Sequence, residues 1–148
     1  MRWLTIPITA SGAIVHAEFG VISPRRRALI AAGLPVPQPV TVPMLVDTGA
    51  SHTFIDSSVL NDRLGLTAKN RHKFHSASTS QDAPQECEGF DVSLTLGNSQ
   101  DQTLWRIEVL EVMASNERRD HGLLGRDILK LVQLEWRGTS EVLRIGYV

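Results

Sequence analysis

The stretch MLVDTGASHTFI, residues 44–55, places a single acid at the end of an apolar run and follows it with small residues. The acid is Asp47, and Thr48, Gly49 and Ala50 come next. Glycine allows a tight turn and a close approach to the backbone, while small neighbours leave room beside the carboxylate. An Asp followed closely by a Gly is most often an ordinary turn. Here the turn lies between two apolar segments, which predicts a strand that ends by presenting its carboxylate to a ligand.

A second candidate motif, of different sequence, follows the Asp-Thr-Gly turn late in the chain. Residues 122–129 read GLLGRDIL, in which the apolar pair Leu123 and Leu124 lies between two glycines. The same segment runs on into a pattern that predicts a short helix. The context of both segments, rather than the tripeptide alone, makes the turn a candidate functional site.

Most of the remaining sequence predicts short strands separated by turn residues. The clearest is FDVSLTLG, residues 90–97, where Phe90, Val92, Leu94 and Leu96 alternate with polar residues, as a half-buried strand requires. The predicted fold is therefore mostly β, a small closed barrel or sandwich with one or two short helices.

The length of 148 residues favours one domain that spans residues 1–148. Within it, residues 23–40 form a local insertion, in which residues 25–32 can make two helical turns that stop at Gly33. A second short helix is predicted over residues 56–66, with Asp56 at its N-cap. The segments 2–8 and 13–22 predict a hairpin.

The charge balance excludes some classes of partner. Fifteen Lys and Arg nearly cancel sixteen Asp and Glu, and no basic stripe with interleaved aromatics occurs, so neither nucleic acid nor a membrane is expected as a partner. The run Arg25, Arg26 and Arg27 is interpreted as a solvated face.

The single cysteine and the N-terminal segment bear on location. Cys87 alone cannot form an internal disulfide, which suits a reducing compartment. Polar residues, Pro7 and Gly12 interrupt the first apolar run, so a strand-turn-strand is expected there instead of a signal peptide. We therefore expect a cytoplasmic location.

At residues 46–50, VDTGA, and 122–129, GLLGRDIL, the sequence resembles the retropepsin-like aspartic peptidases, which include the retroviral proteases. The resemblance covers most of the chain from about Val40 onward and leaves the insertion outside. It implies the closed β-barrel of that family, with a β-hairpin flap where HSASTSQDAPQECEGF, residues 75–90, stands in this chain.

The resemblance implies hydrolysis of peptide bonds by two aspartates that share a proton and activate a water molecule. Two carboxylates a few Å apart cannot both ionise, so one acts as a base toward water while the other donates to the scissile carbonyl. The chain carries only one Asp-Thr-Gly, so the second aspartate must come from a second copy, which predicts a C2 homodimer with Asp47 at its axis. No cofactor is implied.

Site residues follow from the same resemblance. It assigns catalysis to Asp47, Thr48 and Gly49, with the Thr48 hydroxyl clamping the opposing loop. The predicted substrate-binding residues come from the turn, the flap and the late apolar pair: Ala50, Ser51, Ser78, Thr79, Ser80 and Leu124. The apolar terminal segments 2–8 and 142–148 are candidates for an interface sheet, and pairing within one subunit is the alternative.

Three departures from the family pattern carry information. Ala50 stands where many pepsin-like enzymes have a hydroxyl that stabilises the ionised aspartate, so we predict activity at mildly acidic pH. Ser51 and His52 stand where retroviral proteases have an acid that pairs with the arginine of the second motif, which leaves Arg126 without that partner. The presumed flap is polar where retroviral flaps are rich in glycine.

Other functions fit the sequence less well. His72, His75 and Cys87 are possible zinc ligands, but the two histidines are three residues apart in a predicted strand and would face opposite ways, so no metal is predicted. A serine hydrolase lacks its Gly-x-Ser-x-Gly, and a phosphate-binding loop is missing. The alternative that stays open is a catalytically weak retropepsin-fold module for dimerisation or peptide binding.

Overall fold

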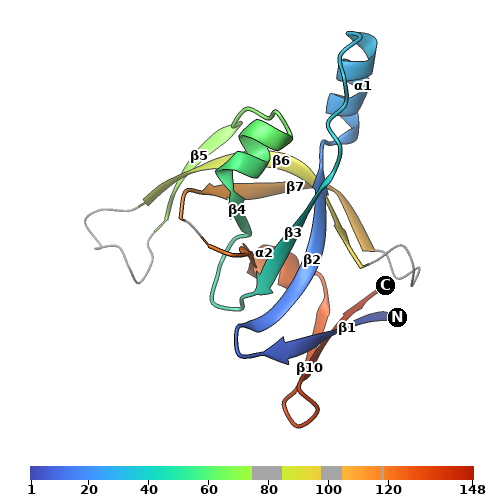
Figure 1. The fold of residues 1–148 in the computed structure, drawn as a ribbon, viewed down its shortest axis with the longest axis vertical. Helices are drawn as coiled ribbons and strands as arrows, with labels where there is room; N and C mark the ends of the chain where they lie inside the picture. Colours follow the sequence, from blue (N-terminus) through green and yellow to red (C-terminus); the bar gives the residue numbers. More distant parts are fainter. Residues whose placement is uncertain (75–84, 98–104, 118) are drawn as a thin grey trace.

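The computed structural model describes residues 1–74, 85–97, 105–117 and 119–148. Strands dominate these residues, and Figure 1 shows how they are arranged. The strands are β1 Arg2–Thr9, β2 Gly12–Gly20, β3 Val40–Val46, β4 Phe54–Asp56, β5 Asn70–Phe74, β6 Gln85–Leu96, β7 Trp105–Ser115, β8 Gly122–Leu124, β9 Gln133–Arg137 and β10 Val142–Tyr147. The helical elements are α1 Ser23–Ala31, the π-helical turn η1 Val59–Arg63 and α2 Arg126–Leu129.

Six of these strands close into a barrel. They follow the order β6, β7, β4, β8, β3, β2, and a further pairing between β2 and β6 completes the ring. β5 extends the sheet beyond β6, and β1, β10 and β9 extend it beyond β2. The predicted mostly-β closed barrel with short helices is confirmed.

The alternation predicted for β6 fills the barrel interior. Phe90, Val92, Leu94 and Leu96 are all buried with at most 1 % of their surface exposed. Ser93, expected to face outward, is buried as well, at the point where Gly20 of β2 pairs with it. The interior of a small barrel is thus closed by side chains, as such barrels require.

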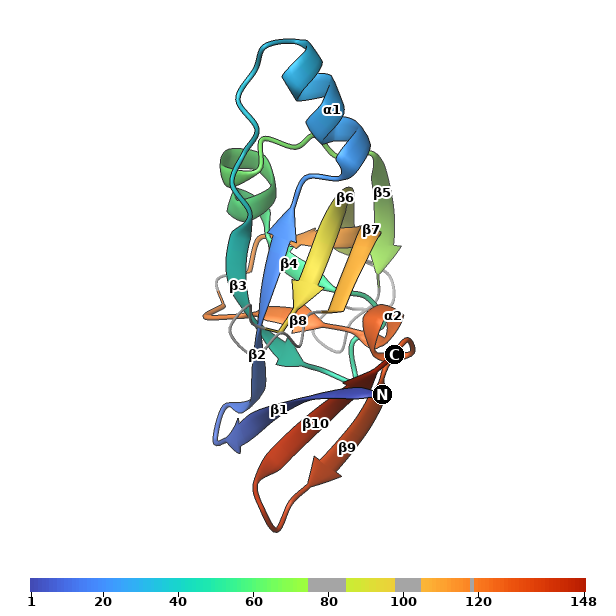
Figure 2. The same ribbon diagram turned by 90° about the vertical axis from the view of Figure 1, so that its right-hand side faces the viewer.

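Helix α1 projects away from the barrel and buries none of its side chains (Figures 1 and 2). It ends before Gly33, whose φ of +69° suits a residue without a Cβ. The predicted helix and its exposed position on the surface are confirmed. Ile30 and Leu34 are exposed at the end of this projection.

The second predicted helix forms with a different hydrogen-bond pattern. Oδ1 of Asp56 accepts a bond from the backbone N–H of Ser58 at 2.8 Å, as an N-cap would. The N–H of Leu64 bonds to the carbonyl of Val59, five residues back, so the turn is π-helical and wider than the predicted α-helix. Leu64 is nevertheless buried, and Gly65 ends the turn with a φ of +62°.

The two terminal segments pair with each other within the chain. β1 and β10 are antiparallel from Arg2 opposite Tyr147 to Pro7 opposite Val142, which leaves the two termini side by side (Figure 1). The segments predicted as candidates for an interface sheet therefore have partners inside one subunit. No helix in the described part of the chain is long and apolar enough to cross a bilayer.

Candidate active site

The Asp-Thr-Gly turn begins where strand β3 ends. β3 runs parallel to β8, and the backbone N–H of Asp47 bonds to the carbonyl of Leu124 at 3.0 Å. Oδ1 of Asp47 accepts the N–H of Gly49 at 2.9 Å, and the Asp47 carbonyl accepts the N–H of Ala50 at 3.2 Å. A Cβ on Gly49 would lie 3.1 Å from Oδ1, so glycine keeps the space beside the carboxylate open. Asp47 is half-buried and presented, as the sequence predicted.

The second motif packs directly beneath this turn. A Cβ on Gly125 would lie 2.3 Å from the carbonyl oxygen of His52 and 3.0 Å from that of Ala50. The next residue, Arg126, donates its backbone N–H to the Ala50 carbonyl at 2.8 Å. Only a residue without a side chain fits at position 125. The two motifs singled out in the sequence are therefore in direct contact in the fold.

Arg126 has a role that the sequence left open. Its Nη1 donates to the backbone carbonyl of Thr48 at 2.8 Å, at the tip of the turn. A charged donor to a carbonyl makes a stronger hydrogen bond than a neutral one. Arg126 thus holds the turn through its backbone, without the acidic partner found in retroviral proteases.

Asp127 and Thr53 form a second tie that sequence reasoning missed. Oδ2 of Asp127 accepts the backbone N–H of Thr53 at 3.0 Å, and Oδ1 accepts the Thr53 hydroxyl at 2.8 Å. The same hydroxyl oxygen accepts the N–H of Gly125 at 3.2 Å, and Thr53 is fully buried. The sequence signal that could have found this tie is the acid that follows Gly-Arg in the second motif.

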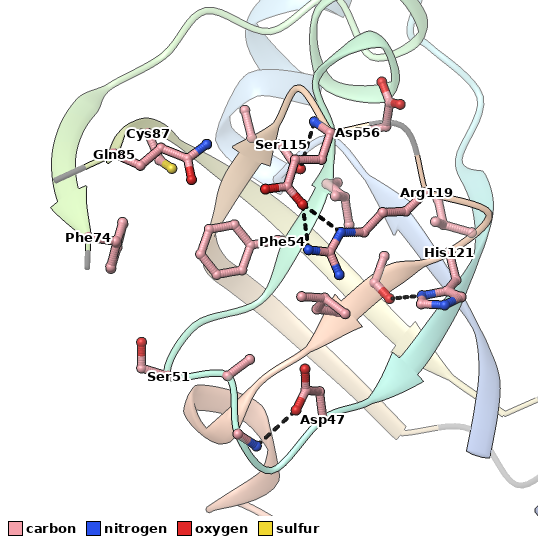
Figure 3. Close-up of a pocket in the computed structure, with 18 of the residues that line it drawn as sticks. Asp47, Ser51, Phe54, Asp56, Phe74, Gln85, Cys87, Ser115, Arg119 and His121 are labelled. Carbon is pink, nitrogen blue, oxygen red and sulfur yellow. Dashed lines mark hydrogen bonds and ion pairs between the residues drawn. The ribbon is translucent and has the colours of Figure 1, made fainter. Parts of the chain in front are cut away.

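A pocket of about 440 Å³ opens next to the carboxylate of Asp47 (Figure 3). Its lining combines aromatic rings, those of Phe54 and Phe74, with charged side chains that include Arg119. Arg119 forms a close ion pair with Glu117. The full lining comprises Val42, Asp47, Gly49, Ala50, Ser51, Phe54, Ile55, Asp56, Phe74, Gln85, Cys87, Ala114, Ser115, Glu117, Arg119, Asp120, His121, Gly122 and Leu123.

The comparisons with known proteins agree with this geometry. A family model described as aspartyl protease matches residues 34–128, which include both motifs. The chain belongs to the aspartyl protease family. A retropepsin-like aspartic protease from Rickettsia conorii has a similar solved structure, with a TM-score of 0.62 and 12 % identity over 99 % of this chain and 91 % of that one. That likeness shows a retropepsin-like fold. No curated protein matches the sequence.

Within this aspartyl protease family member, the predicted site residues lie in several places. Asp47, Gly49, Ala50 and Ser51 all line the pocket. Thr48 is exposed at the tip of the turn. The three predicted flap residues, Ser78, Thr79 and Ser80, lie outside the described residues.

Leu124 lies in the barrel core instead of the pocket. It is fully buried, while its neighbour Leu123 lines the pocket. The reason is the alternation of β8, which sends successive side chains to opposite faces. The pocket residues Phe54 and Phe74 were also missed, although their apolar character and their places beside the turn and the presumed flap were visible signals.

Two side chains in the pocket lining, Cys87 and Asp56, have shifted pKa values. Burial, and secondarily the charge of Glu117, raises the pKa of the Cys87 thiol, so it stays neutral and is a poor nucleophile. The hydrogen bonds from Ser58 lower the pKa of Asp56, so this carboxylate stays ionised at the pocket rim.

The residues considered as zinc ligands have other contacts. His72 lies opposite Cys87 on paired strands, but its Nε2 lies 3.0 Å from Oε1 of Glu111. Among the residues that the structure describes, no three His, Cys, Asp or Glu side chains are placed to hold a metal ion. His75 lies outside them.

Proposed function

We propose that this chain is an aspartic endopeptidase that acts as a homodimer, with Asp47 of each copy at one shared site. The observation that carries the proposal is the single Asp-Thr-Gly turn, whose half-buried carboxylate borders a pocket of about 440 Å³. Membership of the aspartyl protease family supports it. The substrate is a protein or a peptide that can place a side chain in this pocket.

The proposed chemistry needs only the two carboxylates and water. The ionised Asp47 of one copy takes a proton from the water, whose oxygen attacks the scissile carbonyl carbon. The protonated Asp47 of the other copy donates to the carbonyl oxygen, and proton return to the leaving nitrogen completes the cleavage of the C–N bond. The two groups hold different protonation states because like charges at short distance cannot both ionise.

The hydrogen bonds around the turn suit this chemistry. Arg126 donates to the carbonyl of Thr48 at the tip of the turn, and Asp127 accepts from the buried Thr53, which follows the turn in the chain. Fixed carboxylates are worth more to catalysis than mobile ones, because their orientation is established before substrate binds. In the homodimer each turn meets its own copy across the C2 axis, and the exposed Thr48 hydroxyl reaches the opposing loop.

One observation favours a second candidate, a module that binds peptides but cleaves weakly because it does not pair its active-site turns. β1 and β10 are paired within the chain, so a sheet built from the termini of two copies has fewer open backbone groups to use. A fold alone does not establish an activity. The two candidates differ in whether Asp47 is needed for the observed function.

The experiment compares the wild-type chain with Asp47→Ala and Asp47→Asn on a mixed peptide library between about pH 4 and pH 8, with products identified by mass spectrometry. We expect cleavage by the wild type, inhibition by a pepstatin-type compound, and loss of cleavage in both variants. Peptide binding without cleavage, retained in Asp47→Asn, would instead establish the binding module.

A further inference from the structure

Side chains of β5 and of the residue just before it converge on one carboxylate of β7, that of Glu111. Nδ2 of Asn70 donates to Oε2 of Glu111 at 2.9 Å, and Nζ of Lys69 lies 3.6 Å from the same oxygen. The buried Nε2 of His72 lies 3.0 Å from Oε1, an ion-pair contact without the geometry of a linear hydrogen bond. Since β6 lies between β5 and β7, Glu111 joins two strands that the sheet order keeps apart.

Gly89 of β6 makes room for this contact across the sheet. It is paired with Asn70 on one side and with Met113 on the other. A Cβ at this position would lie 3.0 Å from Cδ and Oε2 of Glu111. The carboxylate thus occupies the space that a side chain on the middle strand would take.

These ties act on a strand that has little else to hold it. β5 is the last strand on its side of the sheet and is paired with β6 alone among the described strands. A strand with one neighbour and few buried contacts opens more readily than the strands of the barrel. Groups that fix β5 therefore also fix whatever its far end carries.

The far end of β5 carries Phe74 into the pocket wall. Alternate residues of a strand share a face, so Phe74 lies on the same face as His72. Its ring lies 4.7 Å from the ring of His52 and 5.7 Å from that of Phe54, centroid to centroid, both edge to face. Such arrangements are favourable for aromatic pairs. In the view of Figure 3, Phe54 lies between Phe74 and Arg119.

Charged groups face the contact between His72 and Glu111 from each packed strand. Burial alone would raise the pKa of Glu111, but the hydrogen bond from Asn70 and the charges of His72 and Lys69 outweigh it and lower the pKa. Lys69 also lies 2.8 Å from Asp91 of β6, and the hydrogen bond to Asp91 raises the lysine pKa, so its charge persists.

The lowered pKa of Glu111 bears on how long its contacts persist. Because the pKa is lowered, the carboxylate stays ionised in mildly acidic solution and continues to accept the hydrogen bond of Asn70 and to attract Lys69.

We propose that Glu111 is a positioning residue for the substrate pocket, which holds β5 through Asn70, Lys69 and His72 and thereby keeps Phe74 against His52 and Phe54. This inference rests on the proposed function, because it assigns the pocket to a peptide substrate. The effect reaches the substrate through Phe74, since Glu111 itself does not line the pocket.

An NMR experiment tests the positioning without any need for catalysis. Cross-relaxation between the ring protons of His52 and Phe74 is measured under one set of conditions in the wild type, Glu111→Gln and His72→Asn. The matched control is Glu86→Gln, because Glu86 lies on the same hairpin with an exposed contact of 3.9 Å to Arg71. We expect a strong signal in the wild type and the control, and a weaker signal in Glu111→Gln and His72→Asn.

One result of this experiment would overturn the proposal. It is a ring contact between His52 and Phe74 that is as strong in Glu111→Gln as in the wild type.

Kinetics supply the second test, on a peptide that the wild type cleaves. Glu111→Gln is expected to raise KM about two- to five-fold, the size of a partly exposed ion pair, with a much smaller change in kcat. An unchanged KM despite a weakened ring contact would refute the role in substrate binding. If the wild type cleaves nothing, the proposed function fails, while the NMR result still decides the positioning of Phe74.

Discussion

Single residues fix the Asp47 turn from below, and the most consequential of them is Asp127. Its carboxylate accepts the N–H and the hydroxyl of Thr53 and also the N–H of Ile128, at 2.8 to 3.0 Å. Thr53 is fully buried, so water cannot replace these bonds when the carboxylate is removed. A buried donor without a partner costs about 1–3 kcal/mol.

Asp127→Ala is therefore expected to lower the free energy of unfolding by about 2–4 kcal/mol. Asp127→Asn keeps one acceptor oxygen and should cost clearly less. Urea denaturation of the two variants beside the wild type measures both values, and Thr53→Ser serves as a control that keeps the hydroxyl. A loss below about 0.5 kcal/mol in Asp127→Ala would show that the turn does not depend on this pair.

The residue scale also shows where sequence reasoning stops. Asp47 and its small neighbours could be predicted because a presented carboxylate needs those residue types in that order. The partner of Arg126 could not be predicted, because it is the backbone carbonyl of Thr48. Every residue has such a carbonyl, so the sequence does not mark which one is used. The choice between Leu123 and Leu124 depended on the face of a three-residue strand, which is too short to show a period.

Among the elements, the β8–α2 connection determines how the two motifs meet. Gly125 lies at this connection, with the backbone of Ala50 and His52 packed against its Cα. Backbone atoms cannot move aside as a flexible side chain can. Any side chain at 125 must therefore displace either the turn or the strand.

Gly125→Ala is expected to destabilise the fold by about 3 kcal/mol or more, or to prevent folding. Gly138→Ala is the matched control, because a Cβ there would meet nothing closer than 3.7 Å, from Nε1 of Trp136. Thermal unfolding followed by circular dichroism compares the two. Equal melting temperatures would contradict the close packing of the two motifs.

Element types could be predicted where the hydrophobic period was strong. β6 follows from alternation, the β1–β2 hairpin from two apolar segments that flank the Ser-Gly turn at residues 11–12, and α1 from its stop at Gly33. The π-helical form of η1 could not, because the position of a hydrogen bond one residue further along leaves no mark in the pattern of apolar residues. The attachment of β5 to Glu111 depends on Gly89, a glycine that by sequence predicts only a weak point in a strand.

At the scale of the whole molecule, one chain supplies half of the proposed site. The closed barrel could be predicted from short alternating strands together with the resemblance in two motifs. The assembly could not be read in the same way, since the apolar terminal strands satisfy each other within the chain. A direct test of the assembly must therefore measure what two chains do together.

Mixed dimers provide that test. Asp47→Asn keeps the shape of the side chain, so it should dimerise with the wild type, and each mixed dimer holds only one aspartate at the shared site. With equal amounts and free exchange, a quarter of the dimers carry two wild-type chains, so activity should fall to about half that of the same wild-type chain alone. Thr41→Ser, an exposed residue on β3 away from the turn, is the neutral partner that should leave activity undiminished. Activity unaffected by Asp47→Asn under exchange, with dimers shown by sedimentation, would mean that each chain works alone and that the second carboxylate comes from elsewhere in the same chain.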